Sequence, residues 1–129
     1  MKRKIKISLP IEEPKTWVID IDGVVFVHNS YLDGEDVEVE GVREFIGGLP
    51  SEDLVILLTA REEKYRVNTE GRLQELGIRY DHIIFDIPKG ERVLINDRKP
   101  DSTKTAFAVN TARNEFPYFV IKREKDLNS

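Results

Sequence analysis

The feature of this chain that most constrains its fold is a series of short apolar runs that each end in polar residues. Residues 16–19 lead directly into Asp20-Ile21-Asp22-Gly23, and the uninterrupted apolar run 54–58 ends at Thr59. Short runs that are apolar at every position are typical of strands buried in a parallel sheet. We therefore expect each run to be a core strand that carries a polar group to its carboxyl end.

The same pattern continues further along the chain. Residues 82–85, 93–95 and 106–109 are β-prone, and the last two of these runs are followed by Asn96-Asp97 and Asn110. These three runs bring the number of expected core strands to five.

Two helices are expected between the early strands. Apolar residues within 42–49 recur at i, i+3, i+4 and i+7, and residues 61–76 have one apolar face before Gly77. Alternating strands and helices predict an α/β fold. We expect a single Rossmann-like domain over residues 1–129, with three layers, a mainly parallel five-stranded sheet and a core at about 16–110.

Two further elements are expected outside this alternation. A small hairpin fits between Val24 and Val39, with a turn at Asp33-Gly34. Residues 118–121 could add one strand, paired with residues 5–9 at an edge, although both ends of the chain are also compatible with solvated tails.

Composition narrows the classes of function. The chain of 129 residues contains 40% hydrophobic residues and no cysteine, which predicts one globular domain without disulfides or a zinc–thiolate site. No segment approaches the roughly 20 apolar residues of a membrane span, so a cytoplasmic location is the default expectation. The net charge of −4 argues against general nucleic-acid binding.

The strand ends indicate phosphoryl-transfer chemistry. Parallel strands present their carboxyl ends at one edge of a sheet, so Asp20, Asp22, Thr59 and Asp97 should converge there. Clustered carboxylates need a compensating cation, and a site made only of oxygen donors suits Mg²⁺. A carboxylate can then attack a phosphate, while a second carboxyl protonates the leaving oxygen.

At these motifs the sequence resembles the phosphatases of the haloacid dehalogenase superfamily, over most of residues 16–110. The matching segments are Asp20-Ile21-Asp22-Gly23-Val24, Leu57-Leu58-Thr59-Ala60-Arg61, a lysine, and an acidic pair after a later strand. The resemblance implies that Asp20 is the nucleophile and a metal ligand, and that Asp22 is the acid/base and binds the metal through its main-chain carbonyl. It further implies phosphate binding by Thr59, a phosphoryl contact from Lys89, and metal ligation by Asp97.

Several residues near these motifs are additional candidates. The acidic pair of the family is here Asn96-Asp97, so Asn96 and Asp101 are candidates for the outer shell of the metal. Lys99 and Lys104 are rivals of Lys89 for the phosphoryl contact. Substrate-binding candidates are Gly23, Ala60, Arg61 and Arg98, although a salt-bridged surface role suits both arginines equally well.

The spacing of the motifs leaves no room for a cap domain. The resemblance implies that such capless members act on large or exposed phosphate groups, or borrow a lid from a neighbouring subunit, so a homo-oligomer is one option. Motif spacing is similar to that of small phosphatases of sugar-phosphate metabolism, which favours a small phosphorylated metabolite as substrate. The alternatives are a polynucleotide or other macromolecular phosphatase, and a noncatalytic or receiver-like phosphoaspartate domain.

Overall fold

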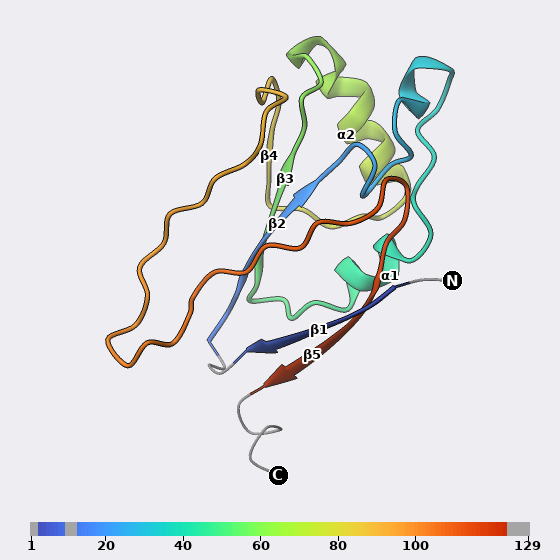
Figure 1. Cartoon of the computed structure of the whole chain (residues 1–129). Helices are drawn as coiled ribbons and strands as arrows, with labels where there is room; N and C mark the ends of the chain where they lie inside the picture. The colour runs from blue at the N-terminus through green and yellow to red at the C-terminus, as the bar shows by residue number, and fades with distance from the viewer. Residues whose placement is uncertain (1–2, 10–12, 124–129) are drawn as a thin grey trace.

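The computed structural model describes residues 3–9 and 13–123, and it shows an α/β chain whose described strands form two parallel sheets (Figure 1). In chain order the elements are β1 (Lys4–Leu9), β2 (Thr16–Asp20), the 3₁₀ turn η1 (Ser30–Leu32), α1 (Val42–Gly47), β3 (Leu54–Leu58), the 3₁₀ turn η2 (Glu63–Tyr65), α2 (Arg66–Glu75), β4 (His82–Ile84) and β5 (Tyr118–Arg123). None of the helices in this part of the chain is both long and apolar enough to cross a membrane.

The central sheet has the strand order β2-β3-β4 and is parallel throughout. Asp20 is in register with Leu58, and Leu58 is in register with Ile84, so the three strands end at the same level. The expectation that β2 and β3 are parallel strands with aligned carboxyl ends is confirmed, and the structure shows that they are adjacent. This alignment brings the residues after each strand to one edge.

The two faces of this sheet are buried to different extents. Val55 and Leu57 are fully buried, whereas Val18 and Ile84, on the opposite face, are 57% and 48% exposed. A continuous apolar run had suggested burial on both faces. Within the described residues, only one face of the sheet is well covered.

Both expected helices are present, although α2 begins at Arg66 and not at residue 61, and the marked apolar positions Phe45, Leu49 and Leu76 are only partly buried. Val42 and Ile46 of α1 are fully buried, as is Leu73 of α2. Gly77 follows α2 with a φ of 69°, a conformation that favours glycine at a helix end. The buried cluster joins both helices to the sheet; its members are Ile19, Ile21, Val25, Phe26, Val39, Val42, Ile46, Val55, Leu57, Leu73, Ile78 and Phe116.

A short antiparallel pairing stands where the hairpin was expected. The N–H of Val27 donates to the carbonyl of Val37, and the N–H of Val39 donates to that of Val25, around an isolated bridge between Phe26 and Glu38. The segment between these pairings contains η1.

The two ends of the chain pair as expected, but they do not form an edge of the central sheet. β1 and β5 form a separate two-stranded parallel sheet, with Ile5 opposite Phe119. An aromatic group links this sheet to α1, because the ring of Phe45 lies 5.1 Å from that of Phe116 and 5.0 Å from that of Phe119.

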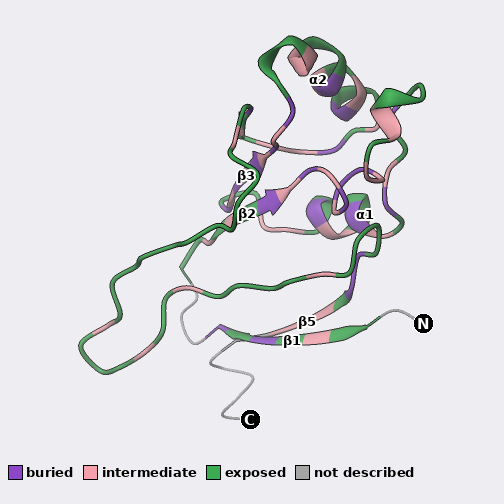
Figure 2. Cartoon of the chain, turned by 45° about the horizontal axis from the view of Figure 1, so that its top comes forward, coloured by how far each residue is buried: buried purple, intermediate pink, exposed green. Residues whose placement is uncertain are grey.

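The expectation of one five-stranded sheet is wrong for residues 93–95 and 106–109, which form no strand. Both lie in a long loop between β4 and Phe116 that extends away from the central sheet and the helices (Figure 1). We call this loop the arm (residues 86–115). Val93, Leu94 and Ile95 are 84%, 70% and 91% exposed (Figure 2). Residues with high β-propensity form a strand only when their main-chain groups can hydrogen-bond to a neighbouring strand.

Candidate active site

The candidate site lies at the carboxyl ends of β2 and β3. Asp20 is the last residue of β2, and Thr59 follows β3 directly. The N–H of Ile21 donates to the carbonyl of Leu58 at 2.9 Å, which keeps the two chains side by side beyond the strands. Asp22 and Thr59 are thereby placed next to each other, as the aligned strand ends predicted.

A tight turn follows β2 and depends on Gly23. The carbonyl of Ile21 accepts hydrogen bonds from the N–H groups of Val25 and Phe26, both at 2.9 Å. Gly23 has a φ of 86°, and it donates to the carbonyl of Phe26 while its own carbonyl accepts from the N–H of Asn114. Gly23, a candidate for substrate binding, is therefore engaged through its main chain in forming the turn.

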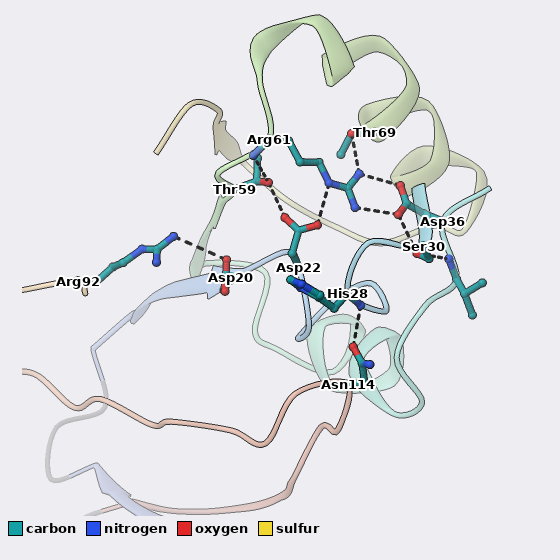
Figure 3. A network of polar contacts seen from close by, with 11 residues as sticks. Asp20, Asp22, His28, Ser30, Asp36, Thr59, Arg61, Thr69, Arg92 and Asn114 are labelled. Carbon is teal, nitrogen blue, oxygen red and sulfur yellow. Dashed lines mark hydrogen bonds and ion pairs between the residues drawn. The ribbon is translucent and has the colours of Figure 1, made fainter. Parts of the chain in front are cut away.

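Asp22 is held by two donors that come from the end of β3 (Figure 3). The hydroxyl of Thr59 donates to Oδ2 of Asp22 at 2.7 Å, and Nε of Arg61 donates to Oδ1 at 2.9 Å. The main-chain N–H of Arg61 in turn donates to the hydroxyl oxygen of Thr59 at 3.0 Å. The Asp22 carboxylate thus has a defined orientation, and the hydroxyl proton of Thr59 is directed to it.

Arg61 is buried and is the centre of a larger network. Its Nη1 and Nη2 donate to the two carboxylate oxygens of Asp36, both at 2.8 Å, and Nη1 also donates to the hydroxyl of Thr69 at 2.9 Å. The ring of Tyr31 covers the guanidinium at 4.0 Å. Although burial acts to lower the pKa of Arg61, its hydrogen bonds to Asp36 and the charge of Asp22 raise it on balance.

Asp20 has different surroundings from Asp22. Its side chain is 45% exposed, and Nη2 of Arg92 lies 3.9 Å from Oδ1. Partial burial raises the pKa of Asp20, and the charge of Asp22 raises it further, while Arg92 acts in the opposite direction. An anionic Asp20 would therefore gain from an additional cation beside it.

Ala60 follows Thr59 at this edge, whereas the other predicted residues lie on the arm and make no contact with Asp20, Asp22 or Thr59 among the described residues. Lys89, Asn96, Asp97 and Arg98 are all exposed, and the side-chain amide of Asn96 donates to the hydroxyl of Thr105 at 2.7 Å. The side chain of Thr103 lowers the pKa of Asp101 by hydrogen bonding, as does the N–H of Thr103, which donates to Oδ1 of Asp101 at 2.9 Å. Across residues 3–9 and 13–123, no three His, Cys, Asp or Glu side chains are close enough together to hold a metal ion.

Sequence reasoning missed the partners of Arg61 and the cation beside Asp20. Asp36 and Thr69 come from a turn and from α2, and neither belongs to a recognisable motif. Arg92 lies on the arm, eight residues after the end of β4. The available signal in the sequence was the position of Arg61 just after an apolar strand. An arginine that becomes buried at such a position requires acidic partners.

Comparison with known proteins adds no relative. No family model, no curated protein and no solved structure matches this chain.

Proposed function

We propose that this protein is an Mg²⁺-dependent phosphomonoester hydrolase of the haloacid dehalogenase superfamily, which acts through a phosphorylated Asp20. The observation that carries the proposal is the contrast between two carboxylates two residues apart. Asp22 is oriented by Thr59 and Arg61, whereas Asp20 is half-exposed and lies 3.9 Å from the guanidinium of Arg92. Two carboxyls in unlike environments are suited to two different catalytic roles.

The proposed reaction has two steps. In the first, an Asp20 oxygen forms a bond to phosphorus, the bond from phosphorus to the leaving oxygen breaks, and Asp22 gives its proton to that oxygen. In the second, a water oxygen forms a bond to the phosphorus of the aspartyl phosphate, the bond from phosphorus to the Asp20 oxygen breaks, and the water gives a proton to Asp22. Inorganic phosphate leaves, and both side chains return to their starting states.

The residues at the edge fit a magnesium ion. Asp20 supplies a carboxylate whose pKa is raised by burial and by Asp22, and every candidate donor is an oxygen. Mg²⁺ is commonly held by one or two carboxylates together with waters and substrate phosphate. Asp20 and the main-chain carbonyl of Asp22 would hold it here. The chemistry that bound Mg²⁺ supplies is relief of the repulsion between carboxylate and phosphate.

Main-chain donors at the same edge support phosphate binding. The N–H groups of Asp22 and Ala60, which follow β2 and β3, donate to no acceptor among the described residues. Pairs of such donors at strand ends are well suited to phosphate oxygens. Lys89 and Arg98 remain the proposed side-chain contacts, and both would have to approach from the arm.

The proposal includes a fourth strand: residues 93–95, which form no strand in this structure, would pair with β2 and extend the central sheet toward the Rossmann-like sheet of this superfamily. Two observations support it. The edge of β2 opposite β3 has no strand partner within the described residues, and the arm comes close to the carboxyl end of β2, because Nη2 of Arg92 lies 3.9 Å from Oδ1 of Asp20. Pairing there would bury Val93, Leu94 and Ile95 and would carry Asp97 toward Asp20.

The direct test of this function is hydrolysis of p-nitrophenyl phosphate by the purified chain. Phosphate release should stop when EDTA removes divalent metal and should return when Mg²⁺ is added. A panel of sugar phosphates, nucleotides and 3′-phosphorylated oligonucleotides would then define the substrate, for which we propose a small phosphorylated metabolite. Equal rates with and without metal would contradict the proposal, and a preference for the oligonucleotides would favour a polynucleotide phosphatase.

Asp97 provides a separate test of the metal site. We expect Asp97→Ala to weaken Mg²⁺ binding by at least about tenfold, since it removes a ligand charge, whereas Asn96→Ala removes only a dipole. Calorimetric titration of the two variants with Mg²⁺ measures this without reference to activity. If both bind Mg²⁺ as the parent does, Asp97 is not a ligand, and Asp101 is the next residue to test.

A further inference from the structure

The arrangement around Arg61 suggests a role that differs from substrate binding. A guanidinium has five N–H donors, and four of those of Arg61 are used by Asp22, Asp36 and Thr69. The ring of Tyr31 covers one of its faces. Little of this side chain remains available to a ligand.

Arg61 uses different nitrogens for its two acidic partners. Asp36 accepts from both terminal nitrogens of Arg61, so only Nε is directed at Asp22 (Figure 3). Arg61 therefore contacts Asp22 through one N–H instead of through its two-pronged end. Bidentate pairing is the stronger and more restrictive mode, and here Asp36 takes it.

Asp36 is itself fixed from several sides. The hydroxyl of Ser30 donates to Oδ1 of Asp36 at 3.1 Å, and the main-chain N–H of Val37 donates to the Ser30 hydroxyl oxygen at 3.2 Å. Nε of Arg72, on α2, donates to the main-chain carbonyl of Asp36 at 2.8 Å. Asp36 is 5% exposed and Arg61 is 4% exposed, so the pair has almost no contact with water.

We propose that Asp36 and Arg61 are positioning residues for Asp22: Asp36 holds the two terminal nitrogens of Arg61, so that Arg61 aims the Asp22 carboxylate at the leaving oxygen through Nε alone. This role rests on the proposed function, because it concerns the proton that Asp22 transfers. Loss of Asp36 would release both terminal nitrogens to pair with Asp22. The Asp22 carboxylate would then turn away from the leaving oxygen.

The test compares two phosphate esters in the presence of Mg²⁺. Phenyl phosphate has a leaving group that needs a proton, and p-nitrophenyl phosphate has one that largely does not. We expect Asp36→Asn to lower the single-turnover rate of phenol release from phenyl phosphate by about 10- to 100-fold, since misdirected acid catalysis carries a penalty of this order. The single-turnover rate of p-nitrophenol release, which does not include the water-activation step common to both esters, should fall by less than about threefold.

Two further variants separate positioning from general damage. Glu35→Gln removes an acid from the adjacent position, where the side chain is 76% exposed and lies 3.8 Å from Arg72, and it should retain the parent rates on both esters. Arg61→Lys keeps the charge but lacks the two-pronged end, so it should not preserve the phenyl phosphate rate.

If Asp36→Asn does not fold, Thr69→Val provides a second variant that tests the same positioning role. This substitution removes an acceptor of Arg61 at nearly constant shape, and it should produce a smaller loss that is again confined to phenyl phosphate. An equal loss on both esters, or no loss in either network variant, would overturn the positioning role. A parent enzyme that hydrolyses neither ester would overturn the proposed function and this role together.

Discussion

Asp20→Asn is expected to lower kcat by at least about 10³-fold on every phosphate ester, because the amide is neither a nucleophile nor an anionic ligand. The substitution is close to isosteric, and the amide oxygen of asparagine can still accept the hydrogen bond from the main chain of Ile21; Nη2 of Arg92 lies 3.9 Å from Oδ1 of Asp20. The fold should therefore survive. Single-turnover rates on p-nitrophenyl phosphate, with a thermal unfolding curve for each protein, measure both expectations.

A matched control is available at the same edge of the sheet. Asp86 follows β4 closely, is exposed, and has a φ of 59°, which asparagine tolerates well. Asp86→Asn removes the same charge from a nearby strand end and should retain activity within about twofold. Comparable losses in the two variants would mean that the effect reflects charge at this edge rather than a nucleophile.

Asp22→Asn is expected to cause the second largest loss, on the order of 10² to 10⁴ in kcat, because leaving-group protonation and water activation both fail. The amide can keep the local contacts: its oxygen can accept from Nε of Arg61, and its NH₂ group can donate to the Thr59 hydroxyl, which can rotate to accept. The network and the fold should therefore persist.

The dependence of the activity loss on the leaving group distinguishes Asp22→Asn from Asp20→Asn. The loss in Asp22→Asn should be smaller for p-nitrophenyl phosphate than for phenyl phosphate, because only the second needs a proton from Asp22. The kinetics of aspartyl-phosphate formation and decay on the two esters provide the measurement. A loss of the same size for both would argue that Asp22 does not transfer the proton.

The central part of the fold was predictable because its determinants are local. The apolar runs of β2 and β3 end at Asp20 and just before Thr59, and parallel pairing of two such runs aligns their ends without further information. The spacing of Val42 and Ile46 likewise specified the buried face of α1. These patterns depend on neighbours within a few residues.

The rest depended on contacts between distant segments. Residues 93–95 have the composition of a strand, yet strand formation also requires a neighbouring strand. The composition of the segment does not identify which part of the chain that neighbour is. The same holds for the network around Arg61, where Asp36 lies 25 residues before the arginine and Thr69 lies eight residues after it. Neither partner belongs to a motif, so only the tertiary arrangement brings them together.

The claim that Asp20 becomes phosphorylated can be tested by acid quench and peptide mass spectrometry. The enzyme would be mixed with p-nitrophenyl phosphate and Mg²⁺, quenched within the first turnover, digested, and mapped beside the Asp20→Asn variant. We predict that the peptide containing Asp20 gains the mass of one phosphoryl group in the parent and not in the variant. A phosphoryl group on another residue, or turnover by the parent without any modified peptide, would contradict the account.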